Sequence, residues 1–187
     1  MTDIEEPLVA RTAQEAAQRV LAIMAITSRS HEIVAKQSRS WVEENGIDQY
    51  FSEEERSFYY LPEKPSDSDI FNFSWRAEAL VSIIWALGGL SEFPSLNQQV
   101  DIWAIPSIQV ATSSPALFIA NAELRPIEAI EEMESKLYHQ HWRVRDAQLF
   151  RREMPEELNP SVVYERRYGL SWLVGWGEDW DDVPTDT

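Results

Sequence analysis

Apolar residues recur every three or four positions along most of this chain, the spacing of one face of an α-helix. The pattern is clearest over 72–88, where the apolar positions at this spacing are Phe73, Ala77, Leu80, Ile84 and Leu87. The segment is apolar nearly all round, which is typical of a helix surrounded by other helices. Gly88 and Gly89 follow it and mark its end.

The same period predicts four further helices, over 8–28, 30–45, 115–122 and 126–152. Pro7 and Pro126 stand where the first and last of these begin, because proline is tolerated in the first turn of a helix. In the first helix we expect the charged residues Arg11, Glu15 and Arg19 on the outer side. Three tryptophans of this chain are expected in the core: Trp75, Trp85 and Trp142.

Two shorter motifs predict where helices begin. Ser52 and Glu55 have the spacing of a capping box, in which each side chain accepts a hydrogen bond from the backbone of the other. A short helix should follow directly, with Phe58 facing inward. Asn159 and Pro160 form a second start signal, for a final helix that ends at Gly175 and has Val163, Arg167, Leu170 and Val174 on its inner stripe.

Residues 90–114 are poorly periodic. Their apolar positions fit an extended segment or an irregular helix broken by Pro106: Val100, Ile102, Ile105 and Ile108. The chain has no internal repeat and no low-complexity linker. We therefore predict one all-α domain over 1–187, with about seven helices and one short extended segment near 100–110.

Composition and charge exclude several classes of protein. The hydrophobic share of 44% in 187 residues is enough for a core without disulfides, and there is no cysteine to ligate a metal. A net charge of −16 repels phosphate backbones and anionic lipid, so we expect no nucleic acid and no membrane as partner. No apolar run approaches the ~20 residues of a membrane span, and none resembles a secretory signal. We expect a cytoplasmic protein.

The segment 176–187 combines five carboxylates and two tryptophans with no basic residue. We expect Trp176 and Trp180 to pack on the body of the domain, because indoles left in water cost free energy. The candidate binding residues of this acidic tail are Asp179, Trp180, Asp181, Asp182 and Asp186. They lack the spacing of a calcium loop, so no metal site is predicted.

Two interpretations of the tail carboxylates stay open. They can pair with basic residues of the chain itself, and the candidates are Arg143, Arg145, Arg151 and Arg152. They can also cover the basic surface of a protein partner, in the way acidic inhibitors of cationic enzymes gain association rate from long-range attraction.

A second group of candidates is charged and expected near helix starts and inner faces: Arg125, Glu128, His141, Arg145, Asp146, Glu165, Arg166 and Arg167. Arg167 lies in register with apolar positions, so a carboxylate partner such as Asp146, Glu128 or a tail aspartate is expected. The group is either an ion-pair network that fixes helix packing or an anion or substrate site. His139 and His141 point to opposite sides of a helix and cannot chelate one ion.

Several groups of residues match a known family. They are Trp75, Glu78, Ala79, Leu80 and Trp85 to Gly88; Leu124 to Pro126 and Glu128; His141, Trp142 and Arg145 to Ala147; Glu165 to Arg167, Leu170, Trp172 and Leu173; and Trp180 to Val183 with Thr185 to Thr187. With these residues the chain resembles a bacterial family catalogued as domain of unknown function 4272. The resemblance implies a helical, intracellular protein and carries no activity. The stretch around Gln140 departs from the family pattern, because His139 and His141 make it richer in histidine than expected. The resemblance therefore assigns no histidine role.

Common catalytic motifs are missing. The chain has no Gly-x-Gly-x-x-Gly, no phosphate loop and no Gly-x-Ser-x-Gly elbow, and no cofactor is expected. Our leading hypothesis is a non-catalytic cytoplasmic interaction module whose acidic surface binds a basic protein, for example an immunity-type inhibitor of a cationic toxin or enzyme. The alternative is a hydrolase or transferase with a pocket near His141, Arg145, Glu165 and Arg167.

Overall fold

The computed structural model describes residues 8–30 and 32–185, and this part of the chain contains helices and no strand. The α-helices are α1 (Ala13–Arg29), α2 (Glu32–Asn45), α3 (Glu53–Tyr59), α4 (Asp67–Ala86), α5 (Pro106–Ser113), α6 (Pro115–Ala120), α7 (Ile127–Leu149) and α8 (Pro160–Leu173). Three single turns of 3-10 helix accompany them: η1 (Ile47–Tyr50), η2 (Ile102–Ala104) and η3 (Trp180–Asp182). The predicted all-α fold is confirmed.

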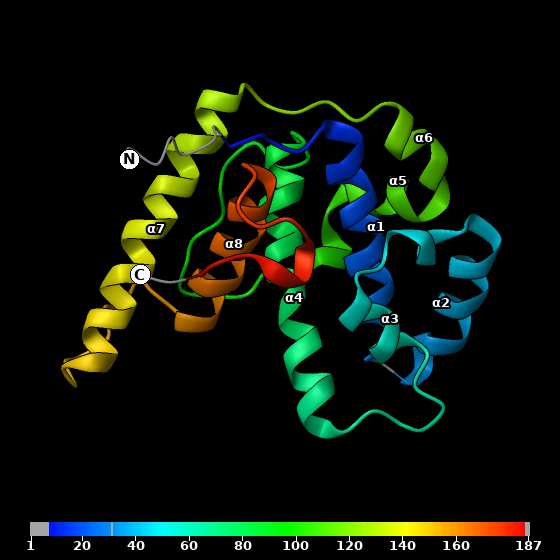
Figure 1. Ribbon diagram of the computed structural model, residues 1–187, viewed down its shortest axis with the longest axis horizontal. Coiled ribbons are helices and arrows are strands. Elements are labelled where there is room, and N and C mark those ends of the chain that lie inside the picture. Colours follow the sequence, from blue (N-terminus) through cyan, green and yellow to red (C-terminus); the bar gives the residue numbers. More distant parts are fainter. Residues whose placement is uncertain (1–7, 31, 186–187) are drawn as a thin grey trace, which may run out of the picture.

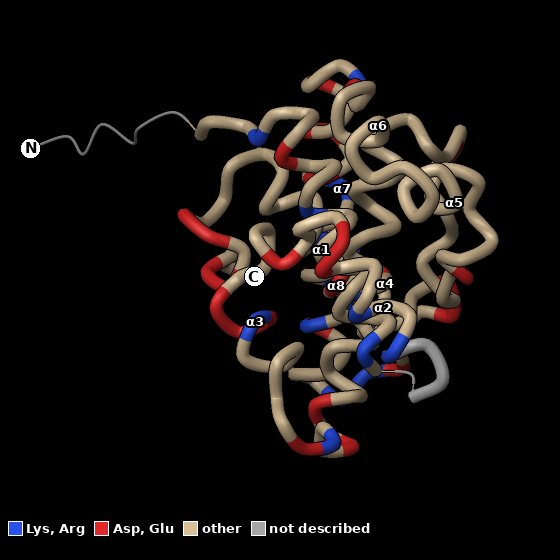
Figure 2. The backbone as a smooth tube through the Cα atoms, turned by 90° about the vertical axis from the view of Figure 1, so that its right-hand side faces the viewer, with Lys and Arg blue, Asp and Glu red and all other residues tan. Residues whose placement is uncertain are grey.

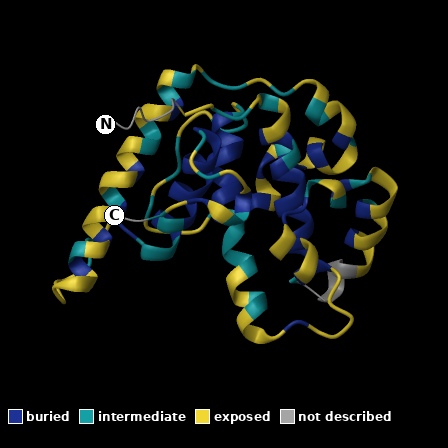
Figure 3. Ribbon diagram, viewed as in Figure 1, coloured by how far each residue is buried: buried dark blue, intermediate teal, exposed yellow. Residues whose placement is uncertain are grey.

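The long helices pack side by side in an order that differs from their order in the chain. α7 packs on α8, α8 on α4, α4 on α1, and α1 on α2, an arrangement that can be followed across Figure 1. Buried residues concentrate on α1, on α8 and on the second half of α4, whereas α7 is largely exposed and the first half of α4 is exposed or half-buried (Figure 3). The core therefore lies where α1, α4 and α8 meet.

The first helix is set by a capping box. Thr12 accepts a hydrogen bond from the amide of Glu15 at 3.2 Å, and the Glu15 carboxylate accepts one from the amide of Thr12 at 2.7 Å. The helix thus begins at Ala13, later than the predicted start. The prediction that Arg19 lies on the outer side of this helix is also wrong. Arg19 is 7% exposed and donates to the Glu55 carboxylate at 2.7 Å. The buried pair neutralises a charge that an amphipathic pattern places in solvent.

α4 and α8 cross at close range. A Cβ atom on Gly169 would lie 2.5 Å from the carbonyl oxygen of Ala79, well inside van der Waals contact. Close by, the Ser82 hydroxyl donates to the carbonyl of Arg166 at 2.8 Å. Glycine at this position therefore permits the approach of the two central helices.

A fully buried ion pair connects these helices to the loop after α4. Nε and Nη2 of Arg166 both lie 2.9 Å from Oε2 of Glu78. Nη1 of Arg166 donates to the carbonyls of Pro94 and Ser95, each at 2.7 Å. Oε1 of Glu78 accepts from the amide of Val100 at 2.9 Å. The pair thus supplies hydrogen bonds to a loop that lacks regular structure of its own.

Near 100–110 the sequence left an extended segment or an irregular helix open. The structure has the helical alternative, as η2 and α5, and the extended one is wrong. Asp101 caps a 3-10 turn by accepting from the amide of Trp103 at 3.0 Å. Pro106 then occupies the first turn of α5. Proline starts a helix here because its missing amide would have no partner in a first turn anyway.

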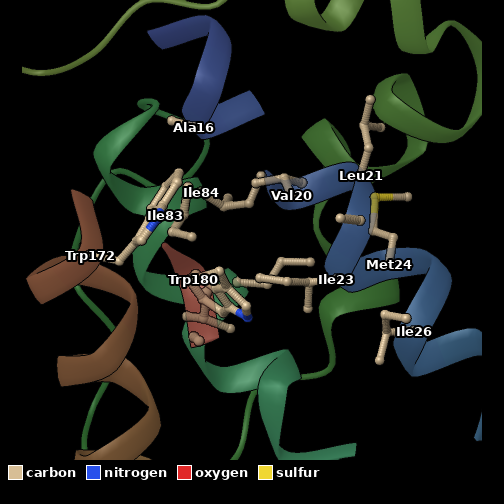
Figure 4. Packing of buried hydrophobic residues seen from close by; sticks show 14 of the residues in the cluster. Ala16, Val20, Leu21, Ile23, Met24, Ile26, Ile83, Ile84, Trp172 and Trp180 are labelled. Carbon is tan, nitrogen blue, oxygen red and sulfur yellow. The ribbon is translucent and has the colours of Figure 1, made fainter. Parts of the chain in front are cut away.

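The end of the described chain is anchored by one tryptophan. Trp180 is 2% exposed, its ring centroid lies 5.5 Å from that of Trp172, and its carbonyl accepts a hydrogen bond from Tyr168. Figure 4 shows it among core residues contributed by α1, α4 and α8. Trp176 is 43% exposed, so the expectation that both indoles pack on the body is confirmed for Trp180 and wrong for Trp176.

Candidate functional site

A cleft of about 890 Å³ opens between the first half of α4, the second half of α7 and the start of α8. This volume is within the range of small-molecule sites in proteins. The lining residues used below are Phe71 and Trp75 of α4, His141 and Arg145 of α7, and Tyr164 and Glu165 of α8. Arg76, Glu54 and Thr185 also reach it.

His141 reaches the cleft from the inner stripe of α7, which also buries Leu137 and Val144. Its Nδ1 lies 2.7 Å from Nη1 of Arg167. Because a guanidinium can only donate, Nδ1 is the acceptor. Burial lowers the pKa of His141 to about 4, and the nearby Arg167 and Arg145 add to the effect. The imidazole is therefore neutral at pH 7 and carries its proton on Nε2.

Arg167 lies behind His141 and is 5% exposed. Its Nη1 also donates to the carbonyl of Thr185 at 3.1 Å, and its guanidinium carbon lies 4.8 Å from the ring centroid of Tyr138. Arg167 thus links α7, α8 and the chain end. Asp146, one of its expected partners, instead pairs with Arg152 at 2.7 Å.

Glu165 and Arg76 form the inner wall of the cleft on the opposite side. Nη1 of Arg76 lies 3.3 Å from Oε2 of Glu165, and the Arg76 guanidinium stacks 4.3 Å from the ring centroid of Tyr168. Burial raises the pKa of Glu165, although the charge of Arg76 opposes the shift. A carboxyl group whose proton affinity is raised in a cleft is a feature of catalytic acids and also of structural ion pairs.

Arg145 differs from the other charged residues of the cleft. Its side chain is exposed, and it forms no ion pair with any residue that the structure describes. Aromatic side chains line the facing wall, where Phe71 is 61% exposed and its ring centroid lies 6.1 Å from that of Trp75. The ring of Tyr164 lies edge-on to His141, with centroids 5.7 Å apart. The cleft thus combines a cation on one side with an aromatic wall on the other.

The described carboxylates of the tail lie on an acidic face that we define by six residues: Glu53, Glu54, Glu178, Asp179, Asp181 and Asp182. Of these six residues, Glu54 also lines the cleft and the other five do not. Oδ2 of Asp181 accepts from the amide of Glu54 at 3.0 Å, which holds the start of α3 against the tail. Figure 2 shows acidic segments near the end of the chain marked C. None of the six carboxylates forms an ion pair within residues 8–30 and 32–185.

The arginines proposed as partners of the tail make other contacts. Arg143 pairs with Glu157 at 2.8 Å and Arg152 pairs with Asp146, so the expected pairing of these two with the tail is wrong within the described chain. Arg11 contacts the tail instead, by donating to the carbonyls of Gly177 at 2.7 Å and Glu178 at 3.2 Å. These bonds go to backbone carbonyls and neutralise none of the tail carboxylates up to Thr185.

The sequence grouped four residues that the structure brings together at the cleft. It grouped His141, Arg145 and Glu165, which line the cleft, and Arg167, which lies directly behind His141. Among the tail residues, Asp179 accepts from the amide of Trp180 and Asp182 is exposed, while Asp186 lies outside the described residues.

Sequence reasoning missed the α4 wall of the cleft. Trp75 and Trp142 were both expected in the core, yet Trp75 is half-buried in the cleft wall and Trp142 is 54% exposed. Phe71 and Trp75 share a face of α4 four residues apart, followed by Arg76, and this spacing was the available signal. It does not distinguish a core stripe from a cleft wall.

Over the residues that the structure describes, no group of three or more histidine, aspartate or glutamate side chains is placed to hold a metal ion. Of the helices in that same part of the chain, none combines the length and apolar character needed to cross a membrane.

The model of one protein family, Domain of unknown function (DUF4272), matches residues 2–183. The chain belongs to the DUF4272 family. This confirms the resemblance found in the sequence, and the match extends over every helix of this DUF4272 protein, including the α4, α7 and α8 walls of the cleft. No curated protein and no solved structure matches the chain.

Proposed function

We propose that this DUF4272 protein is a non-catalytic cytoplasmic interaction module that binds a basic protein through the acidic face. The observation that carries the proposal is the meeting of two acidic segments, the first turn of α3 and the tail, at the hydrogen bond from Glu54 to Asp181. Five of the six residues of this face are exposed. A concrete version is an immunity-type inhibitor of a cationic toxin or enzyme.

The electrostatics of the acidic face support a partner. Acidic residues in the first turn of α3 stabilise that helix through its dipole, which accounts for Glu53 and Glu54. Glu178 lies outside any helix and has no such local use. The Asp181 carboxylate beside the start of α3 adds repulsion between like charges. A basic partner relieves that repulsion on binding, and complementary charge accelerates association.

The face is also held in one shape. Trp180 is buried, and the Arg19 guanidinium lies 4.9 Å from its ring centroid. Asp179 and Asp181 on either side are fixed by hydrogen bonds to backbone amides. A surface ordered before binding loses less conformational entropy in the complex, which favours tight binding.

The test compares the native protein with a variant in which three exposed acids are neutralised, Glu53→Gln, Glu178→Gln and Asp182→Asn. Proteins captured from the source cells are identified by mass spectrometry, and the basic ones are purified and titrated by calorimetry at several salt concentrations. We expect one partner whose dissociation constant rises at least tenfold in the variant, with a weaker salt dependence than for the native protein.

The matched control neutralises three exposed acids in and just before the first turns of α7, Glu123→Gln, Glu128→Gln and Glu131→Gln, which changes net charge equally. We expect this control to bind the partner within twofold of the native protein. If both triple variants weakened binding equally, the effect would come from net charge and not from the acidic face. Unchanged binding by the variant of the acidic face would contradict the proposal.

A second candidate function rests on the cleft. It places His141, Arg145 and Glu165 around one cavity, where the raised pKa of Glu165 suits a general acid. We propose a hydrolase or transferase as the alternative. Screening p-nitrophenyl esters and phosphates tests it. Turnover that Glu165→Gln abolishes while His139→Gln leaves it intact would support the alternative, and turnover equal in all three proteins would contradict it.

A further inference from the structure

We propose that the cleft between α4, α7 and α8 binds a small organic anion, with its acidic group on Arg145 and its apolar body against Phe71 and Trp75. The inference deepens the second candidate function, because it names the ligand class that the cleft takes. It holds whether or not a reaction follows, and of the acidic face only Glu54 reaches the cleft.

The charged end of the ligand is assigned from the surroundings of each cation. Arg76 already faces Glu165 at 3.3 Å and stacks on Tyr168, so its charge is largely compensated. Arg145 forms no ion pair in the described part of the chain, and its side chain lines the cleft. A guanidinium in this position binds a carboxylate, sulfonate or phosphate with two parallel hydrogen bonds. Arg145 is therefore the anchor for the anion.

His141 adds a second donor near this anchor. Its Nδ1 accepts from Arg167, which places the ring proton on Nε2, and Nε2 bonds to no described residue. His141 lies four residues before Arg145 on α7, so the two side chains share one face of the helix. A neutral donor beside a cation satisfies a second oxygen of an acidic group without adding charge.

The apolar end of the ligand is assigned from the aromatic wall. Phe71 is 61% exposed although it is large and apolar, and Trp75 follows it one turn later on the same side of α4. Tyr164 continues the wall from α8. Exposed aromatic surface that faces a cavity is typical of ligand sites, because its burial on binding releases water. The volume of about 890 Å³ accommodates two fused or linked rings.

The two different walls of the cleft argue against a bare inorganic ion as the main occupant. Phosphate or chloride would reach Arg145 but leave Phe71 and Trp75 in water. An uncharged hydrocarbon would cover the aromatic wall but leave the guanidinium without a counter-charge. A molecule with an acidic group and an apolar body pairs with Arg145 and covers Phe71 and Trp75 at the same time.

The test uses two fluorescent probes that differ in one group. 8-Anilinonaphthalene-1-sulfonate is aromatic and anionic, and N-phenyl-1-naphthylamine is the same molecule without its sulfonate. Fluorescence titration of the native protein should give one site for the sulfonate, with a dissociation constant at least tenfold below that of the uncharged probe. Arg145→Gln should weaken the sulfonate about tenfold, the loss of one charge-assisted contact, and leave the uncharged probe within twofold.

Variants along both walls define the position of the probe. Phe71→Ser should weaken both probes, because it removes apolar contact without touching the charge. Arg143→Gln removes an exposed arginine on a different side of α7 and should change neither. Leu117→Ser alters a second groove that is lined by α6 and should also change neither. Circular dichroism in the near ultraviolet confirms that each variant keeps its packing.

Three outcomes would overturn the inference. These are equal affinity for the two probes in the native protein, equal loss of the sulfonate probe in Arg145→Gln and Arg143→Gln, and loss of binding in Leu117→Ser with no change in Phe71→Ser. Neither probe contains a bond that a hydrolase cleaves. A failure here therefore contradicts the ligand class, whereas absence of turnover contradicts only the catalytic proposal.

Discussion

Arg166 places two of its guanidinium nitrogens 2.9 Å from a single oxygen of Glu78, and both side chains are fully buried. The pair joins α4 to α8, and its remaining atoms hold the loop that includes Pro94 and Val100. Burial of charges is favourable only when each is paired and hydrogen-bonded, and that condition is met here.

Replacing one side chain of this buried ion pair should destabilise the protein. We expect Glu78→Gln to lower the free energy of unfolding by about 3–5 kcal/mol, because the buried guanidinium loses its counter-charge. Arg166→Met should cost a similar amount. The double variant should cost clearly less than the sum, giving a coupling energy above about 1 kcal/mol in urea denaturation. Strict additivity would show that the two side chains act independently.

Gly169 should reverse the usual effect of glycine replacement. Alanine in a helix interior is normally better than glycine by about 1 kcal/mol. At Gly169 the new Cβ would lie 2.5 Å from the carbonyl oxygen of Ala79, so we expect Gly169→Ala to destabilise by more than about 2 kcal/mol. Ser135→Ala, at an exposed position of α7, serves as the propensity control and should be neutral or stabilising. Thermal denaturation compares the two, and a stabilised Gly169→Ala would contradict the close crossing.

Replacing each of the two tail tryptophans by alanine should lower the free energy of unfolding by different amounts. Trp180→Ala should cost about 3–5 kcal/mol, because the indole is 2% exposed and contacts Trp172 and Tyr168. Trp176→Ala should cost less than about 1 kcal/mol, because 43% of the residue is already exposed. Guanidinium denaturation followed by circular dichroism measures both. Similar losses in the two variants would mean that the tail packs differently.

His141 should make the protein less stable at mildly acidic pH. Its pKa falls from an ordinary value of 6.5 to about 4 in the folded state, so the unfolded chain binds the proton more readily. Stability is therefore lost as pH falls from about 6.5 to 4, by an amount on the order of 3 kcal/mol when the shift is fully expressed. Arg167 and Arg145 are the charged groups that act on the ring.

The measurement follows unfolding free energy against pH in the native protein and in His141→Gln, whose amide oxygen can still accept from Arg167. The variant should lose less stability than the native protein between pH 6.5 and 4. His139→Gln changes an exposed histidine on the same helix and should reproduce the native curve. Identical curves for all three proteins would show that the pKa of His141 is not lowered.

Periodicity and capping motifs, which involve residues close in sequence, predict most of the helices. The capping box at Ser52 and the start signal at Asn159 each involve residues close in sequence, and the structure reproduces both. The start of α4 was missed because the preceding stretch has the composition of a loop. Ser66 caps the helix there by accepting from the amide of Asp69 at 3.1 Å, so α4 begins at Asp67. A cap of this kind is ambiguous in sequence, because serine and aspartate also favour turns.

The candidate sites were less predictable than the helices. The partner of Arg166 was not identified, because Glu78 is far away in the chain and looks like any other polar position of a helix. The density of carboxylates in the tail is evident from the sequence. Their neighbour, the start of α3, is not, because the two segments are far apart in the chain. Contacts between distant segments depend on how helices pack, which periodicity does not encode.

The sequence by itself determined the helical class, the buried stripes and the excess of negative charge. These follow from the identities of neighbouring residues, through helix period, capping and simple counting. The tertiary structure alone decided that Phe71 and Trp75 face a cleft, that Arg145 stands in it without a counter-charge from the described residues, and that two acidic segments share one face. The reason is physical: a residue's burial and partners are set by the helices that pack against its own, and those come from other parts of the chain.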